Sequence, residues 1–164
     1  MQIPKPEKRG RKPPRPIRRK RPKKRRQPFA LAMHKWYEEV ADEIWSVIIR
    51  SYSPLCVRCR MRPTHDAMHL VSRSYRQTRW RLDNGLPGCR YCHEVMGRDQ
   101  HEHVRIVERE VGREKWEELN FAKGLRVKVD PAMAGAALSV ELRRRGLTMP
   151  RLPPPPDLPQ RIAR

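Results

Sequence analysis

The sequence predicts an α+β protein in which a small core, stapled by a metal ion, lies between flanking helices and disordered tails. Two pairs of cysteines at C-x-x-C spacing enclose the core segment and indicate a shared metal site. Apolar residues recur at three- and four-residue steps on both sides of it, as in helices that pack against a core. Both ends of the chain combine proline with charge and offer no apolar face. In chain order we expect a disordered basic tail (1–28), an amphipathic helix (29–52), the metal-stapled domain (53–119), a C-terminal helical extension (120–147) and a proline-rich tail (148–164).

Positive charge is concentrated at the N-terminus. The chain of 164 residues carries a net charge of +20, and residues 1–26 supply +13 of it through fourteen Lys or Arg and one acid, Glu7. Cationic side chains that contact phosphates release condensed counterions, so this run favours a nucleic acid as partner over a solubilising tail or an anionic membrane surface. DNA is the expected partner, and RNA is not excluded because phosphate contacts do not distinguish the two polymers. The tail residues expected to bind are Arg18, Arg19, Lys20, Arg21, Lys23, Lys24, Arg25 and Arg26.

The sequence contains no segment that resembles a membrane span or a signal peptide. No stretch approaches the roughly 18 apolar residues of a span, and the positive N-terminus lacks the apolar segment of a signal peptide. We therefore expect no membrane partner and a location inside a cell. In such a reducing compartment, four cysteines favour metal ligation over two disulfides.

The first expected element is an amphipathic helix that begins near Phe29 and ends near Ser51, before Pro54. Its apolar side chains recur at helical spacing, and packing on the core is favoured over base stacking as their role. These side chains are Met33, Trp36, Tyr37, Val40, Ile44, Val47 and Ile48.

Between the cysteine pairs, turn residues separate two short apolar runs at 67–71 and 80–82. These runs predict a short two-stranded unit. A helix is expected to begin at Cys89 or Arg90, and its apolar pattern continues to Gly112.

The remaining elements follow the second cysteine pair. A short helix is expected near Trp116, and a longer one at 132–145, entered through Pro131, which the first helical turn tolerates. From Met149 the prolines predict an extended tail, for which a disordered end is favoured over a proline-rich ligand.

The metal site is predicted by two C-x-x-C pairs that are separated by 29 residues. In such pairs the backbone curls so that two thiolates point at one ion, and two pairs complete a tetrahedral zinc site. A redox C-x-x-C does not come in duplicate, and buried free thiols do not favour this spacing. The predicted ligands of a structural zinc are Cys56, Cys59, Cys89 and Cys92.

Three segments of polar residues accompany these cysteines: HDAMHLVSR (65–73), TRWRLDN (78–84) and CRYCH (89–93). Their order resembles the HNH endonuclease family, and most of all the phage recombination proteins of the NinG and Rap type. Those proteins show a Cys pair, one His followed by a hydrophobic pair and Ser-Arg, an Arg-Trp-Asp-like stretch, an Asn, and a second Cys pair followed by His or Asn. The similarity spans about residues 36–119.

This resemblance implies a ββα-metal fold, treble-clef-like, in which a hairpin and a helix hold one divalent cation over a scissile phosphate of DNA. His69 matches the general base that activates water. Asn84 matches the residue that holds the loop and orients that base, and His93 matches the ligand of the catalytic magnesium or manganese ion. Arg73 and Arg79 are expected to clamp phosphate. The phage resemblance implies the cytoplasm of a bacterial host, at the nucleoid.

Each of these residues also has a purely structural interpretation. His69 suits a core histidine, Asn84 before a glycine suits an ordinary turn, and His93 suits a cap of the cysteine pair. Two usual ligand positions, directly before the base and four residues after the helix histidine, are Met68 and Gly97 here, and neither holds a hard cation. Nearby residues that could substitute are His65, Asp66, His101 and His103.

Two functions therefore follow from the sequence. The first is a metal-dependent HNH-type DNA endonuclease, with branched recombination intermediates as the substrate that the resemblance implies. The second is a non-catalytic, zinc-containing DNA-binding protein that retains the HNH scaffold.

Overall fold

The structure is a computed structural model that describes residues 28–157. The expected basic tail lies outside the described residues except for Pro28, as do residues 158–164. Within the described part, no helix combines the length and the apolarity that crossing a bilayer requires. The elements are α1 (Phe29–Arg50), β1 (Asp66–His69), α2 (Arg76–Arg79), the 3-10 turn η1 (Leu82–Asn84), β2 (Gly85–Gly88), α3 (Arg90–Arg98), α4 (Gln100–Val111), α5 (Arg113–Gly124) and α6 (Pro131–Arg144).

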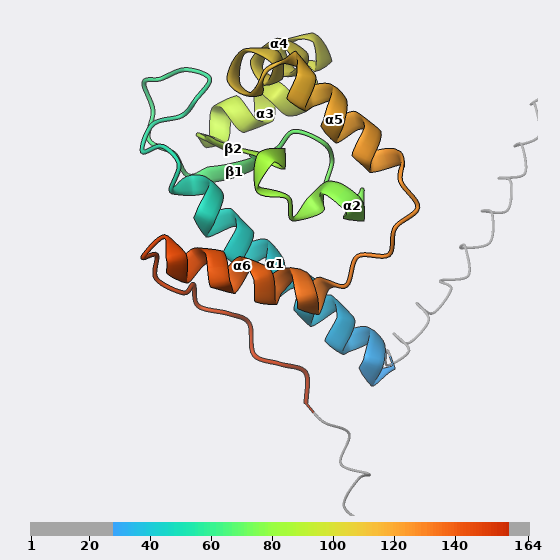
Figure 1. Cartoon of the computed structure of the whole chain (residues 1–164). Helices are drawn as coiled ribbons and strands as arrows, with labels where there is room; N and C mark the ends of the chain where they lie inside the picture. Colours follow the sequence, from blue (N-terminus) through green and yellow to red (C-terminus); the bar gives the residue numbers. More distant parts are fainter. Residues whose placement is uncertain (1–27, 158–164) are drawn as a thin grey trace, which may run out of the picture.

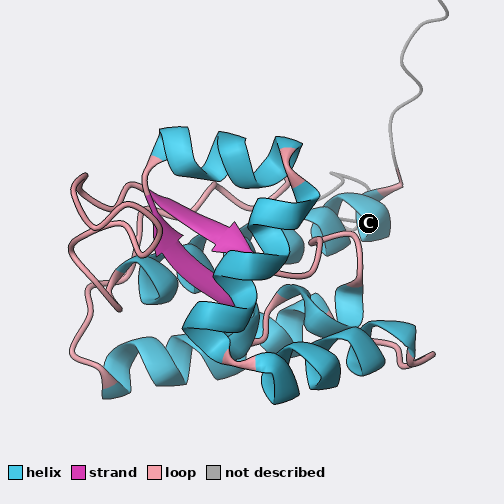
Figure 2. Cartoon of the chain, turned by 90° about the horizontal axis from the view of Figure 1, so that it is seen from above, coloured by secondary structure: helices cyan, strands magenta, loops and turns pink. Residues whose placement is uncertain are grey.

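The described chain is mostly helical and contains a two-stranded hairpin that lies between two groups of helices (Figure 1). The strands β1 and β2 are antiparallel, with Asp66 opposite Gly88 and His69 opposite Gly85. Helices α1 and α6 pack together on one side of the hairpin, and α3, α4 and α5 lie on the other side. Seen from above, helices surround the hairpin (Figure 2).

Two apolar cores hold these layers together. The first joins α1 to α6 and to the segment between the strands, through Val40, Ala41, Ile44, Trp45, Ile48, Ile49, Trp80, Leu138 and Leu142. The second joins the hairpin to α3, α4 and α5, through Val57, Met68, Leu70, Val71, Leu86, Met96, Ile106, Val107 and Leu119. The helices that flank the cysteine segment are therefore packed parts of the same fold.

The second strand differs from the one expected. The strand β2 is formed by Gly85–Gly88, whereas residues 80–82 lie in the bend between α2 and η1. A Cβ added at Gly85 would lie 2.6 Å from Trp45, and one at Gly88 would lie 2.5 Å from Met68. Glycine is therefore required for β2 to lie this close to its neighbours. The apolar run at 80–82, together with the turn propensity of these glycines, predicted the wrong strand.

The predicted helices are confirmed in position, with one correction. The predicted helix at 29–52 is α1, and the predicted helix at 132–145 is α6, which begins where the Asp130 side chain accepts the Ala132 N–H at 2.9 Å. The single helix expected from Cys89 to Gly112 is two helices, α3 and α4. They meet at Asp99, whose side chain accepts the Glu102 N–H at 3.0 Å. Asp and Glu at this spacing form a capping pattern, which marks a helix start within an otherwise continuous apolar period.

The first part of the proline-rich tail is packed on the protein. Residues 148–157 form no helix or strand, but Leu152 contacts the core between α1 and α6. The indole N–H of Trp36 donates a hydrogen bond to the carbonyl oxygen of Pro153 at 2.9 Å. The expectation of a disordered tail is therefore wrong for residues 148–157, because Leu152 packs on the core and the Pro153 carbonyl accepts a hydrogen bond from the Trp36 side chain.

Candidate functional site

The two cysteine pairs meet, as their spacing predicted. All four sulfur atoms lie within 4.8 Å of one another, and Cys56, Cys89 and Cys92 are buried. Zinc with bonds of about 2.3 Å to four thiolates places the sulfurs about 3.8 Å apart. None of the four cysteines forms a disulfide. The cluster therefore has the composition and size of a four-cysteine zinc site.

The backbone shapes each pair locally. Arg60, with φ of 57°, adopts the left-handed conformation after Cys59 and curls the first pair. The Cys56 N–H donates to the carbonyl oxygen of Arg62 at 2.9 Å and closes this loop. The second pair lies at the start of α3, where the Cys89 sulfur accepts the N–H of residue 92 at 3.4 Å. A loop and a helix start thus present their sulfurs to a common centre.

The protonation of two sulfurs depends on their surroundings. Hydrogen bonds from the backbone of Met61 and Arg62 lower the pKa of Cys59 to about 6. Burial raises the pKa of Cys92 to about 12, although the Arg58 guanidinium donates to its sulfur at 3.5 Å. A cation among the sulfurs would offset the cost of the thiolate at Cys92.

His69 lies at the end of β1 and is held in one orientation. Its Nε2 lies 3.0 Å from the carbonyl oxygen of Arg79. Since a carbonyl oxygen only accepts, Nε2 carries the ring proton and Nδ1 is the basic nitrogen. The ring stacks on Trp45, with centroids 3.9 Å apart and an interplanar angle of 15°. Burial lowers the pKa of His69, which keeps the imidazole neutral at neutral pH.

Asn84 is fully buried and joins the two ends of the loop that follows His69. Its Oδ1 accepts the Val71 N–H at 2.7 Å. Its Nδ2 donates to the carbonyl oxygens of Val71 at 3.0 Å and Thr78 at 2.9 Å. Because Thr78 directly precedes Arg79, these bonds fix the carbonyl that holds His69. This geometry agrees with the loop-holding role that the resemblance implies, and that role stays a prediction.

Two residues of α1, outside the cysteine-to-cysteine segment, complete this support. Asp42 accepts hydrogen bonds from Nε of Arg79 at 3.0 Å, from Nη2 of Arg79 at 2.6 Å and from Nε1 of Trp80 at 2.8 Å. Trp45 donates from Nε1 to the carbonyl oxygen of Arg81 at 2.9 Å while its ring contacts His69. Sequence reasoning missed both roles, because their partners lie 36 to 38 residues away and α1 was interpreted only as a packing helix.

His93 lies on the first turns of α3 and is oriented by a buried carboxylate. Its Nδ1 lies 3.0 Å from Oδ2 of Asp66, and Arg90 contacts the other carboxylate oxygen at 3.2 Å. With Nδ1 held in this way, Nε2 is the ring nitrogen left for a ligand. Carboxylates commonly orient metal-binding histidines by this contact. Four nearby residues were expected as possible replacements for the two missing metal ligands. Of these, Asp66 is the one that contacts His93.

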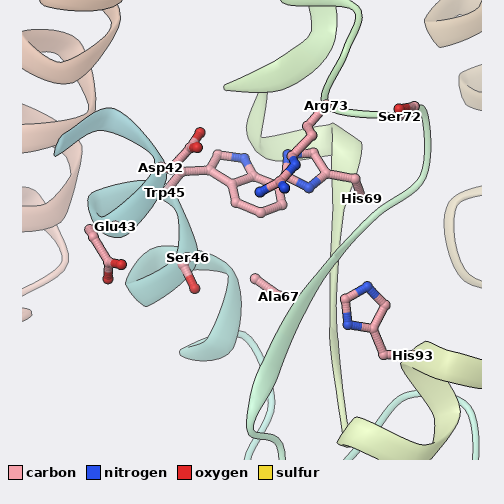
Figure 3. A pocket seen from close by; sticks show the side chains of 9 residues that line it. All are labelled: Asp42, Glu43, Trp45, Ser46, Ala67, His69, Ser72, Arg73 and His93. Atoms are coloured by element: carbon pink, nitrogen blue, oxygen red, sulfur yellow. The ribbon is translucent and has the colours of Figure 1, made fainter. Parts of the chain in front are cut away.

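His69 and His93 line the same cleft, which has a volume of about 520 Å³ (Figure 3). Helix α1 forms one wall with Asp42 and Trp45, and β1, the loop after it and α3 form the other. Arg73 is exposed at this cleft, and its guanidinium has no hydrogen bond or ion pair within residues 28–157. The cleft therefore combines two histidines with a cationic side chain that can reach a phosphate.

Arg79 differs from the phosphate clamp that the sequence suggested. Its guanidinium is bonded to Asp42 and lies 3.4 Å from Glu38, and its side chain is only 15% exposed. These contacts occupy the donors that a phosphate would need. In this geometry the backbone carbonyl of Arg79 is the group that contacts His69.

The residues at the two substituted ligand positions lie away from the cleft. Met68 is buried in the second core, on the face of β1 opposite to His69. Gly97 is exposed on α3, and a Cβ there would meet nothing within 4 Å. His65 and His101 are exposed outside the cleft, and among residues 28–157 only the cysteines gather three or more metal-ligating side chains.

Comparisons with protein-family models, with curated proteins and with solved structures each found no match. The case for a function therefore rests on the geometry of the site.

Proposed function

We propose that this chain is a metal-dependent DNA endonuclease of the HNH type, with β1, β2 and α3 as its ββα-metal unit. One observation carries the proposal: Nε2 of His69 is bound to the Arg79 carbonyl at 3.0 Å, in a cleft shared with His93. That bond leaves Nδ1 basic on a neutral ring, which is the state that a general base needs. A histidine that only filled a core would not line an open cleft together with a second histidine.

His69 would remove the proton from the water that attacks the phosphate. Burial and the Trp45 ring favour the neutral imidazole before the reaction. The imidazolium that forms is stabilised by Asp42, whose charge opposes the effect of burial on the pKa of His69. The Asp42 charge thus makes the protonated ring easier to form than burial alone would allow.

His93 would hold the catalytic cation through Nε2, while Asp66 fixes the other ring nitrogen. A magnesium or manganese ion bound there would supply Lewis-acid stabilisation of the phosphate and of the leaving oxygen. Arg73, at the same cleft, would bind a phosphate oxygen and hold the strand in place. We assign the structural zinc to Cys56, Cys59, Cys89 and Cys92, where it would join the start of α3 to the loop between α1 and β1.

A second possible function is that of a zinc-containing DNA-binding protein without catalysis. It is favoured because the cleft offers few protein ligands for a catalytic cation. Met68 and Gly97 replace two usual ligands, and neither lies in the cleft. His93 would then bind its cation with help from water and phosphate alone, a set that binds magnesium weakly.

The two functions are separated by incubating the full-length protein with supercoiled, linear and branched DNA, with and without magnesium or manganese. We expect cleavage that requires the divalent ion and is fastest on branched DNA. If every substrate is bound and none is cut with either ion, the non-catalytic function replaces the enzyme.

The basic tail is expected to supply much of the affinity for nucleic acid. Deletion of residues 1–26 removes fourteen cationic side chains and one acid. Each lost phosphate contact lowers the slope of log affinity against log salt by about 0.9, so binding should weaken and its salt dependence should flatten. Fluorescence anisotropy on a DNA duplex over a salt series measures both. A full-length chain with these fourteen residues changed to Gln should behave like the deletion; unchanged affinity and slope in either protein would refute a role in binding.

The α1 contacts predict a positioning role for Asp42. Asp42→Asn weakens the charged contacts to Arg79 and so loosens the carbonyl that holds His69. We expect a cleavage rate lower by on the order of 10- to 100-fold, with DNA affinity unchanged. The low-pH limb of the rate profile should also move to lower pH, because the Asp42 charge raises the pKa of His69. Glu39→Gln, which removes an exposed acid of the same helix, is the control and should change neither quantity. Equal behaviour of the two variants would exclude the role.

A further inference from the structure

A second cleft of about 520 Å³ lies beside the proposed catalytic one. It is formed by the loop after β1, the junction of α3 and α4, and α5. Ser72 lines both clefts, so the loop after His69 is their common wall. Its apolar lining includes Val71, Met96 and Val104. A strand that crosses Ser72 therefore passes from one cleft into the other.

Planar rings line this second cleft. Tyr75 is 43% exposed, and the partly buried Trp116 also lines the cleft. The His103 ring lies with its centroid 6.1 Å from the Trp116 ring. Exposed aromatic faces at a groove are surfaces on which nucleobases stack, and the contact tolerates any base because every base has a π-face.

The charge of the lining favours an anion. Lys123 and Arg98 line this cleft, and no Asp or Glu does so within the described residues. The Lys123 ammonium lies 5.8 Å from the centre of the Tyr75 ring and donates to Oδ1 of Asn120 at 2.7 Å. The first cleft is mixed in charge, since Arg73 lines it together with Asp42 and Glu43. A ligand with both a planar ring and a phosphate matches the second cleft.

We infer that this second cleft binds an unpaired nucleotide of the DNA strand whose neighbouring phosphate lies at His69 and His93. The base would stack on Tyr75, and Lys123 would face its phosphate. A base inside a duplex is stacked and paired, and has to leave the helix before it enters such a pocket. The site therefore selects DNA with unpaired bases, such as a single strand, a flap or a branch point. This inference deepens the proposed function and rests on it for the position of the neighbouring phosphate.

The test compares two strands of equal length, oligothymidylate and an abasic deoxyribose-phosphate strand, bound to the full-length protein without divalent ions. Both strands have the same phosphates, so the ratio of their affinities isolates the contribution of the bases. Stacking contributes about 1–3 kcal/mol per base, so Tyr75→Ala should lower the affinity for oligothymidylate about 10-fold and leave that for the abasic strand unchanged. Lys123→Ala should weaken both. Phe121→Ala is the matched control: this aromatic side chain is 73% exposed on α5, outside the cleft, and its removal should change neither affinity.

The outcomes separate this site from the proposed enzyme. If Tyr75→Ala and Phe121→Ala show the same affinity ratio, or if Tyr75→Ala weakens both strands alike, the nucleotide site is overturned even when the wild-type protein cuts DNA. If the ratio falls for Tyr75→Ala alone and its thermal melt matches the wild type, the site stands even when no DNA is cut. In that case only the proposed endonuclease activity is refuted.

Discussion

Replacing His69 by Ala is expected to lower the rate of DNA cleavage by about 100- to 10,000-fold, the usual loss for a general base, while DNA affinity stays almost unchanged. The base acts in the transition state, so its removal costs rate and leaves ground-state binding alone. Plasmid nicking measures the rate, and anisotropy on the same DNA measures the affinity. His93→Ala should lose cleavage in the same way, because the proposed cation loses its protein ligand.

The control for these variants is His101→Ala, which removes an exposed histidine of α4 outside the cleft. It should cut at the wild-type rate. Full cleavage by His69→Ala would refute the assignment of the base. Asn84→Ala is a poor test of catalysis, since Asn84 is fully buried and its loss leaves three backbone bonds unmade, a cost of about 1–3 kcal/mol for each buried group left without a partner.

The pH dependence of the wild-type rate follows from the same residue. Only the neutral imidazole accepts a proton, so cleavage should fall as the pH drops through the pKa of His69. Burial sets that pKa below its usual value of 6.5. The acid limb should therefore lie below pH 6.5 and should be absent from the residual activity of His69→Ala. An acid limb above pH 6.5 would contradict a buried, neutral base.

Removal of the metal from the cysteine cluster is expected to have the largest effect on stability. Structural zinc contributes an apparent 10–16 kcal/mol in small zinc-dependent peptides, roughly the whole stability of a domain. We expect one zinc per chain by metal analysis. Treatment with a strong chelator, or Cys92→Ser, should abolish the cooperative melt of the hairpin, α3, α4 and α5. The melt can be followed by circular dichroism and by hydrogen exchange.

Hydrogen exchange adds a spatial control to this prediction. The core between α1 and α6 contains none of the cysteines, so its amides should lose less protection than those of α3. Met61→Ala, an exposed change in the loop of the first cysteine pair, should melt like the wild type. A protein without zinc, or a Cys92→Ser variant with an unchanged melt, would refute a structural metal site.

Several features of this protein follow from short-range patterns in its sequence. The two C-x-x-C pairs predicted a cluster that the structure forms, because each pair is set by its own local turn. Helical periodicity placed α1 and α6. The break at Asp99 was also present in the sequence as a capping pattern, although apolar periodicity hid it.

The sequence by itself thus determined the features that depend on neighbouring residues. These are the cysteine pairs, the helices and the positive charge. Only the tertiary structure decided which side chains act together. The histidines and their loop contact Asp42, Trp45 and Asp66, which lie 24 to 38 residues from their partners in the sequence. Short-range sequence patterns do not reveal such contacts. The strand β2 likewise depends on glycines that leave room for Trp45 and Met68. Burial, stacking and hydrogen bonding between distant segments exist only once the chain has packed, and they give His69 its tautomer and its lowered pKa.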